Sequence, residues 1–248
     1  YPERLLDVLL GDLRGYMDDV TESVASLGPD YLPRLLEKID ENASAFTWGA
    51  LRAANSVKLM AERFPGECDS AILSLIEAID CEANGEMAEA CKPALIAIGP
   101  NVIEHIARYI GAGANMDTCL GEVLAAFPTE RSAEIIMDSL EDEDYIEGSY
   151  ISTLEAIGHP DSVNFLIDRC DPDNLTAVEA VLTLSAINDI DRSAVDTWLD
   201  SVEETRALRL QRMQRKPDFV RRIDQIEATP SSASKKKILS KAEKKKRA

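Results

Sequence analysis

The chain has 248 residues and a net charge of −18, from 27 Lys and Arg against 45 Asp and Glu. Apolar residues make up 45% of it and aromatic residues only 5%, so its core must be built mainly from aliphatic side chains. This apolar content excludes a disordered chain, five cysteines are too few for a disulfide scaffold, and no apolar run reaches the ~20 residues of a membrane span.

The first predicted elements form two long helical units. Residues 24–39 (VASLGPDYLPRLLEKI) match residues 95–110 (LIAIGPNVIEHIARYI), and each segment has a Gly-Pro turn between two apolar helical patterns. Between them, residues 59–65 (LMAERFP) and 71–79 (AILSLIEAI) supply another unit of the same form. Each unit predicts a helix, a turn and a second helix.

Shorter units then follow at a nearly constant period. In each, the first helix ends in a segment with Leu at its first position and Ala at its third, namely residues 95–98 (LIAI), 124–127 (LAAF), 154–157 (LEAI) and 184–187 (LSAI). A breaker comes next, which is Gly, Pro or the pair Asn188-Asp189, and a second apolar helical pattern begins after it.

One small residue, the anchor, marks the same place in all the units. The anchors are Ser26, Ala61, Ala97, Ala126, Ala156 and Ala186, at spacings of 35, 36, 29, 30 and 30 residues. Helical hairpins of this size cannot bury their own apolar faces, so neighbours stack into one continuous core. We expect the small anchors to let the paired helices approach closely. The predicted fold is therefore all-α, a right-handed α-α superhelix, or α-solenoid, of about six helical-hairpin repeats over residues 1–202.

The fifth unit resembles a known family of repeats. Residues 139–170 (SLEDEDYIEGSYISTLEAIGHPDSVNFLIDRC) are similar to a HEAT repeat of the short kind first noted in phycobilisome lyases. The likeness extends over roughly residues 20–202 and is better in the later units, although Glu147 and Gly148 stand where the family usually has a basic residue. It implies a HEAT-like solenoid and, because most such proteins are scaffolds or adaptors, a protein-binding function. It also implies an alternative, a bilin-lyase-like enzyme subunit.

The C-terminal part of the chain reverses the charge. Residues 1–202 hold 12 basic and 39 acidic residues (−27), whereas residues 203–248 hold 15 basic and 6 acidic residues (+9). Residues 203–228 predict a basic helix that either caps the last repeat or stands free, and residues 229–248 predict a disordered Lys-rich tail. This tail can attract nucleic acid weakly and without sequence preference, which gives a second alternative, a nucleic-acid-associated adaptor. The charged residues of the tail that we expect to act are Lys235, Lys236, Lys237, Lys244, Lys245, Lys246 and Arg247.

The second helices of the units carry the candidate binding residues. Acidic residues recur there at similar places, with Arg108 as the exception, and they are Glu37, Glu77, Asp138, Asp168 and Asp200. In HEAT-like stacks these helices line the concave face, so the pattern predicts an acidic surface for a partner protein with a basic peptide or helix. The other possibility is that an acidic chain exposes carboxylates everywhere.

No motif in the sequence indicates catalysis. A nucleophile with its base, a phosphate-binding loop and a metal-ligand cluster are all missing, and His105 and His159 are too few for a metal centre. We therefore expect no catalytic residue, cofactor or metal. Trp48 and Trp198 are predicted core anchors. Cys68, Cys81, Cys91, Cys119 and Cys170 are predicted to be small core residues of a cytoplasmic protein.

Overall fold

The computed structural model of the chain describes residues 17–41, 47–79, 85–111, 114–141, 145–190 and 192–200, together with Leu6, Gly11 and Glu143. Within these residues the structure contains α-helices, two 3₁₀ helices and no β-strand, so the all-α prediction is confirmed. None of the described helices is both long and apolar enough to cross a membrane.

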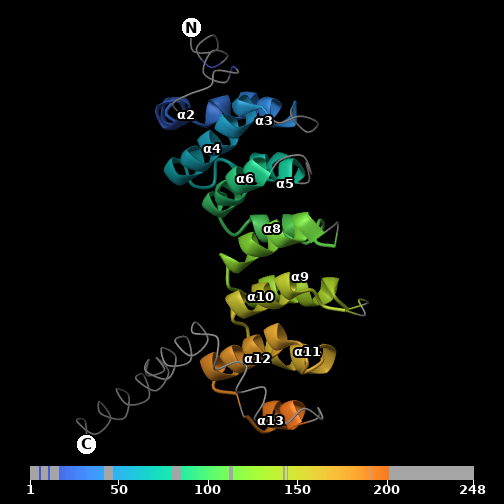
Figure 1. Cartoon of the computed structure of the whole chain (residues 1–248). Coiled ribbons are helices and arrows are strands. Elements are labelled where there is room, and N and C mark those ends of the chain that lie inside the picture. The colour runs from blue at the N-terminus through green and yellow to red at the C-terminus, as the bar shows by residue number, and fades with distance from the viewer. Residues whose placement is uncertain are drawn as a thin grey trace, which may run out of the picture. The chain divides into compact units, whose positions relative to one another are not determined.

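The helices follow one another in pairs around the breakers (Figure 1). The first helices of the pairs are α2 (Met17–Ala25), α4 (Trp48–Arg63), α6 (Gly85–Ile98), α8 (Ala114–Ala125), α10 (Gly148–Ile157) and α12 (Leu175–Asn188). The second helices are α3 (Leu32–Asp40), α5 (Ile72–Ile79), α7 (Val102–Ile106), α9 (Glu130–Ser139), α11 (Asp161–Arg169) and α13 (Arg192–Asp200). The 3₁₀ helices η1 (Pro29–Tyr31) and η2 (Asp69–Ala71) lead into α3 and α5.

Left-handed residues end several of the first helices. Gly28, Gly99 and Gly158 have φ angles of 92°, 108° and 76°, which a residue with a side chain adopts only with strain. After α12 the same place is taken by Asp189, with φ 54°. Asp tolerates this region better than most residues because its short side chain can bond to nearby backbone. The breakers therefore act through backbone conformation.

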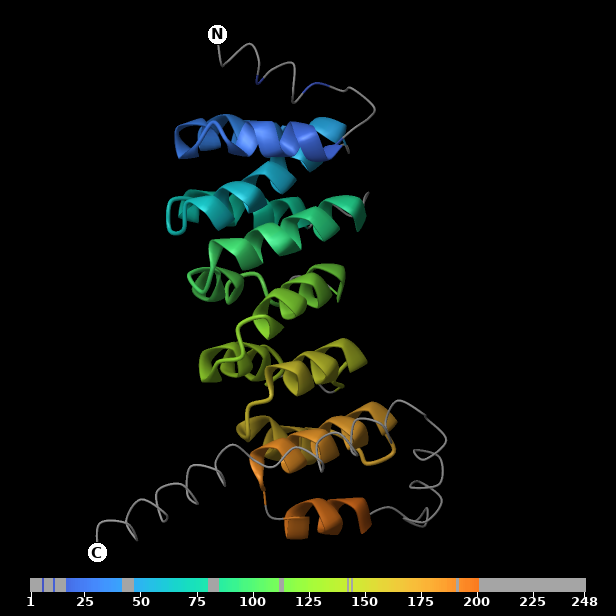
Figure 2. The same cartoon turned by 90° about the vertical axis from the view of Figure 1, so that its left-hand side faces the viewer.

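The chain divides into two compact units, residues 1–141 and residues 142–248. In the first unit, α4 packs against both α2 and α6, and α6 packs against α8, so the first helices form one row. The second helices α3, α5 and α7 form another row in the same order, and each pair lies beside the next (Figure 2). In the second unit, α12 packs against α10, α11 and α13. Most of these helix–helix contacts therefore join a helix to a helix of the adjacent pair.

In the Leu-x-Ala segment that ends the first helix of each short repeat, the leucine is buried and the alanine anchor is not. Leu95, Leu124, Leu154 and Leu184 are all 0% exposed. Ala126 and Ala156 are exposed, Ala97 and Ala186 are half-buried, Ser26 is exposed, and Ala61 alone among the anchors is buried. The expectation that the small anchors allow close helix contact was therefore wrong for the exposed anchors Ser26, Ala126 and Ala156. Residues two apart on a helix lie about 200° apart around its axis, so a buried leucine turns the following alanine away from the core.

Candidate partner-binding surfaces

The five acidic positions predicted from the sequence lie on second helices and are exposed. Glu37, Glu77 and Asp138 are on α3, α5 and α9 of the first unit. Asp168 and Asp200 are on α11 and α13 of the second unit. The structure thus places all five acidic positions on the surface, three of them in the first unit and two in the second.

These carboxylates differ in what they already bind. Glu37 forms an ion pair with Arg34 one turn earlier on α3. Glu77 accepts a hydrogen bond from the hydroxyl of Tyr109 at 3.3 Å. The carboxylates of the other three positions, Asp138, Asp168 and Asp200, make no hydrogen bond or ion pair with any residue that the structure describes. These three are therefore free to receive a cationic partner without breaking an existing contact.

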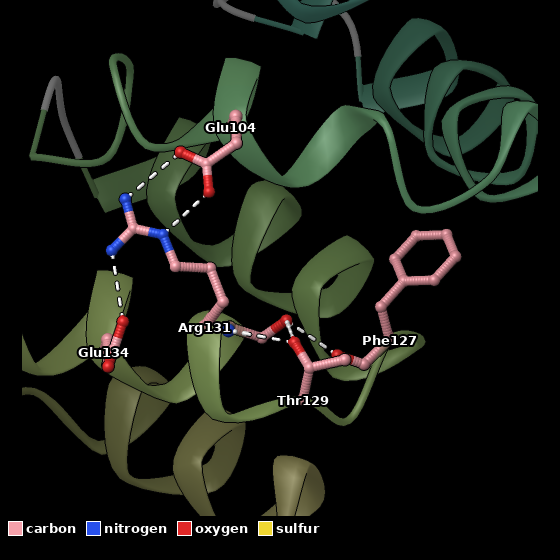
Figure 3. Close-up of polar contacts among 6 residues, drawn as sticks. Glu104, Phe127, Thr129, Arg131 and Glu134 are labelled. Atoms are coloured by element: carbon pink, nitrogen blue, oxygen red, sulfur yellow. Dashed lines mark hydrogen bonds and ion pairs between the residues drawn. The ribbon is translucent and has the colours of Figure 1, made fainter.

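Other exposed carboxylates tie neighbouring helix pairs together. The clearest case is Arg131 on α9, whose guanidinium donates to both oxygens of Glu104 on α7 at 2.7 and 3.1 Å (Figure 3). A third bond, at 3.2 Å, reaches Glu134. The hydrogen bonds from Arg131 hold the pKa of Glu104 below its ordinary value, and those to Glu104 and Glu134 raise the pKa of Arg131. A bidentate pair of this kind fixes orientation as well as distance.

The start of α9 determines where Arg131 lies. Thr129 is the extended N-cap residue, and its hydroxyl accepts a hydrogen bond from the backbone N–H of Ser132 at 3.1 Å (Figure 3). The Ser132 hydroxyl donates in turn to the carbonyl of Phe127 at 2.6 Å. These bonds fix the first turn of α9, so Arg131 in that turn is directed back toward α7.

Sequence reasoning missed this tie, although a signal for it exists. Asn101 stands 30 residues before Arg131, and its side chain donates to Asp69 at the preceding pair, at 2.9 Å. Asn101 and Arg131 thus hold the same place in successive helix pairs, and each contacts the pair before its own. The 30-residue period, applied to polar residues as well as to apolar ones, indicates both contacts.

Ion pairs also join the first helices of the first unit to one another. On α6, Lys92 donates to Glu89 and to Glu122 of α8, both at 2.6 Å, and its side chain is only 12% exposed. Burial disfavours the charged form of Lys92, but the two hydrogen bonds outweigh it and raise its pKa to about 12. On α4, Arg63 pairs with Glu22 of α2. Arg63 and Lys92 therefore both join one helix pair to the next.

An open groove of about 710 Å³ lies between the N-terminal halves of α4 and α6. It is lined by Trp48, Leu51, Asn55, Gly85, Glu86, Glu89 and Ala90. Leu51 and Ala90 are buried, Trp48 is half-buried, and the two glutamates are exposed. The groove therefore offers an apolar floor with a negative edge. The groove is formed by first helices, whereas the sequence analysis placed the binding residues on second helices. The sequence does not indicate the groove, because the groove depends on how α4 and α6 meet.

The remaining predicted residues have structural roles or lie outside the description. Trp198 is buried and donates from its ring nitrogen to the carbonyl of Cys170 at 3.1 Å, so it is the predicted core anchor, whereas Trp48 is half-buried in the groove. Among the described residues, no cluster of three or more His, Cys, Asp or Glu could hold a metal. Residues 203–228 and the tail residues 229–248 lie outside the described part of the chain, as does Cys81.

The described cysteines are thiols suited to packing. Cys68, Cys91 and Cys170 are buried, and Cys119 is half-buried. Burial, with the nearby charges of Glu67 and Asp69, raises the pKa of Cys68 to about 11. Burial also raises the pKa values of Cys119 and Cys170. Since the thiolate is the reactive form, these thiols are poor nucleophiles at neutral pH.

Comparison with known proteins gives no match. No family model matches the chain, and neither a curated protein nor a solved structure is detectably similar to it.

Proposed function

We propose that the chain is a non-catalytic scaffold, a HEAT-like α-solenoid that binds a basic peptide or helix of another protein along the acidic positions of its second helices. The observation that carries the proposal is that some acidic residues pair with basic side chains of the same chain and others do not. Glu22, Glu104 and Glu122 bind basic side chains of adjacent pairs. In contrast, the carboxylates of Asp138 and Asp168 are exposed and make no hydrogen bond or ion pair with any described residue.

Electrostatics favours a cationic partner over an anionic one. Residues 1–202 carry a net charge of −27, from 12 basic and 39 acidic residues, and ties within the first unit already occupy Arg63, Lys92 and Arg131. Such a surface repels nucleic acid and attracts basic segments, and it speeds their encounter more than it tightens the final complex. Binding should therefore weaken as salt is raised.

Charge reversal tests the proposal. A partner is first recovered with the full-length chain as bait and is then purified, so that its Kd can be measured by calorimetry. The test variant is Glu77→Lys, Asp138→Lys, Asp168→Lys. Exposed ion pairs are worth about 0.2–1 kcal/mol each, and reversal adds repulsion, so three reversals should weaken binding roughly tenfold or more.

A matched control separates the second helices from general acidity. The variant Asp30→Lys, Glu67→Lys, Glu147→Lys makes the same charge change at exposed residues outside the second helices. It should bind almost as well as the natural chain. Equal weakening in both variants would contradict the proposal and would leave only a diffuse charge effect.

The recovery step also tests the nucleic-acid alternative. It is run with and without nuclease, and with the full chain and a version ending at Ala228. A partner that survives nuclease treatment and removal of the tail supports binding by the helical body. A partner that is lost with either treatment would assign the function to the basic tail and contradict the scaffold proposal.

A further inference from the structure

One basic residue interrupts the acidic positions on the second helices of the first unit. In chain order these positions hold Glu37, Glu77, Arg108 and Asp138, and all four side chains are exposed. Two residues before each of them stands an apolar side chain that is 0% exposed, namely Leu35, Leu75, Ile106 and Ile136. Residues two apart on a helix point in nearly opposite directions, so the four charged residues hold the same outward place in four successive helix pairs.

These four positions follow one another across the first unit. Helix α3 packs against α5, and α5 packs against α7. Arg108 lies in the turn that continues α7, and the hydroxyl of the next residue, Tyr109, donates to Glu77 of α5 at 3.3 Å. Arg131 of α9 in turn binds Glu104 of α7. A segment that crosses α3, α5, α7 and α9 therefore meets three negative positions and one positive position, which is the third.

Arg108 has no counterion among the residues that the structure describes. Its guanidinium makes no hydrogen bond or ion pair with any of them. The nearest carboxylate along the chain, Glu104, already accepts hydrogen bonds from Arg131 with both oxygens, at 2.7 and 3.1 Å (Figure 3). In contrast, Arg34 and Lys38 on α3 form ion pairs one turn along their own helix. Arg108 therefore presents its charge to a group from another molecule.

A partner segment that fits this row carries charges of both signs. Glu77 and Asp138 favour cations most, because Glu37 shares its charge with Arg34. A cation opposite Arg108 is repelled, whereas a carboxylate there can accept two parallel hydrogen bonds from the guanidinium. A phosphate group fits less well, since its charge of nearly −2 meets the surrounding carboxylates. The matching order is therefore cation, cation, carboxylate, cation.

We propose that the basic segment of the partner carries one acidic residue, which binds Arg108 and thereby sets the register and direction of the segment on the first unit. This inference rests on the proposed scaffold function and specifies the charge pattern of its partner. In the reversed direction the acidic residue would face Glu77, and a shift by one helix pair would place a cation opposite Arg108. Both placements bring like charges together, which is a common way to exclude a wrong arrangement.

Two synthetic helical peptides test the charge pattern. Each has four charged residues at seven-residue intervals on a helix of Ala and Gln, so the charges stand about 10.5 Å apart along one face. Packed helices lie about 8–10 Å apart, so successive charges can reach successive second helices. The matched peptide has the order Lys, Lys, Glu, Lys, and the reference peptide has Lys at all four places.

The Kd values of both labelled peptides are measured by fluorescence anisotropy with the full-length chain and its Arg108→Glu variant. The ratio of the reference Kd to the matched Kd should be about tenfold lower in the variant, because the substitution exchanges attraction and repulsion at one place. The control Lys58→Glu makes the same charge change on α4, a first helix of the same unit. It should leave the ratio unchanged.

The partner recovered with the full-length bait gives a second readout. The Arg108→Glu variant is more negative than the natural chain by two charges, so diffuse attraction alone would tighten its binding to a basic partner. Loss of a specific contact at Arg108 should instead weaken it. Far-UV circular dichroism should show unchanged helicity, because the substituted side chain is exposed.

The inference would be overturned by an unchanged Kd ratio in the Arg108→Glu variant or by an equal fall of the ratio in Lys58→Glu. Tighter binding of the recovered partner by Arg108→Glu would also overturn it, and so would binding of neither peptide. The charge reversal at Glu77, Asp138 and Asp168 leaves Arg108 in place, so it decides the scaffold proposal separately. Binding that is lost on that reversal but indifferent to Arg108 would support the scaffold and contradict the proposed register.

Discussion

The same substitution at the two ends of α10 should change stability in opposite directions. Gly148 is the first residue of this helix and lies outside the left-handed region, whereas Gly158 follows its last residue with φ 76°. A Cβ at either position would meet no atom within 4 Å. Neither effect therefore involves a clash, and the backbone conformation alone decides the sign.

The magnitudes follow from two opposing contributions. Replacing Gly with Ala restricts the unfolded chain and stabilises the folded state by about 0.4–1 kcal/mol when the native conformation suits Ala. At Gly148 this is the main contribution. At Gly158 a left-handed alanine costs roughly 1–2 kcal/mol, which exceeds the gain. Gly158→Ala should therefore destabilise by about 1 kcal/mol, and Gly148→Ala should stabilise by about 0.7 kcal/mol.

Urea denaturation of the full-length variants measures this difference. Unfolding is followed by Trp198 fluorescence, because Trp198 lies in the same compact unit as both glycines. The two midpoints should differ by about 1 M at an unchanged m-value, for m-values of about 1–3 kcal/mol/M. Shifts of the same sign in both variants would refute the argument from backbone conformation.

Three further predictions concern the core and the ties. Leu154→Ala should cost about 2–5 kcal/mol in thermal or urea unfolding, whereas Ala156→Ser on the exposed side of the same helix should change stability by less than ~0.5 kcal/mol; a reversed order would restore the anchor role of the alanines. Because the folded pKa of Glu104 is lowered, its pairing with Arg131 stabilises the fold above the ordinary pKa of 4.5 and is lost as pH falls below it, so Glu104→Gln should make acid unfolding less steep. Because the folded pKa of Lys92 is raised to about 12, its ion pairs stabilise the fold fully below its ordinary pKa of 10.5, and this stabilisation is lost as pH rises through 12. The Lys92→Met variant should therefore be less stable than the natural chain at neutral pH. Between pH 10.5 and 12 it should lose less stability than the natural chain does.

The helices could be predicted because their limits are local. Gly-Pro at residues 99–100 and Gly158 interrupt helices through their own backbone preferences, and a single sequence contains that information. The exposure of the acidic positions could also be predicted, since a carboxylate without a partner is seldom buried. The role of the anchors could not be read from spacing alone. A 30-residue period marks Leu154 and Ala156 equally, and only the helical geometry assigns the leucine to the core.

The ties and the groove needed the structure. The pairing of Arg131 with Glu104 joins residues 27 positions apart, and charged residues that far apart have many alternative partners in a chain with 45 acidic residues. The groove is lined by residues of both α4 and α6, and neither helix alone indicates it. A sequence pattern cannot predict side-chain positions that depend on how two helices pack against each other.

The ties between neighbouring pairs also bear on how the chain folds as it is made. Asn101 reaches back 32 residues to Asp69, and Asn188 reaches back 30 residues to the carbonyl of Gly158. Contacts of such short range allow early folding, because little loop entropy is lost in forming them. Each helix pair that leaves the ribosome therefore finds the pair just before it already present as a template. Within each compact unit, folding can advance with synthesis, and no pair has to wait for the distant end of the chain.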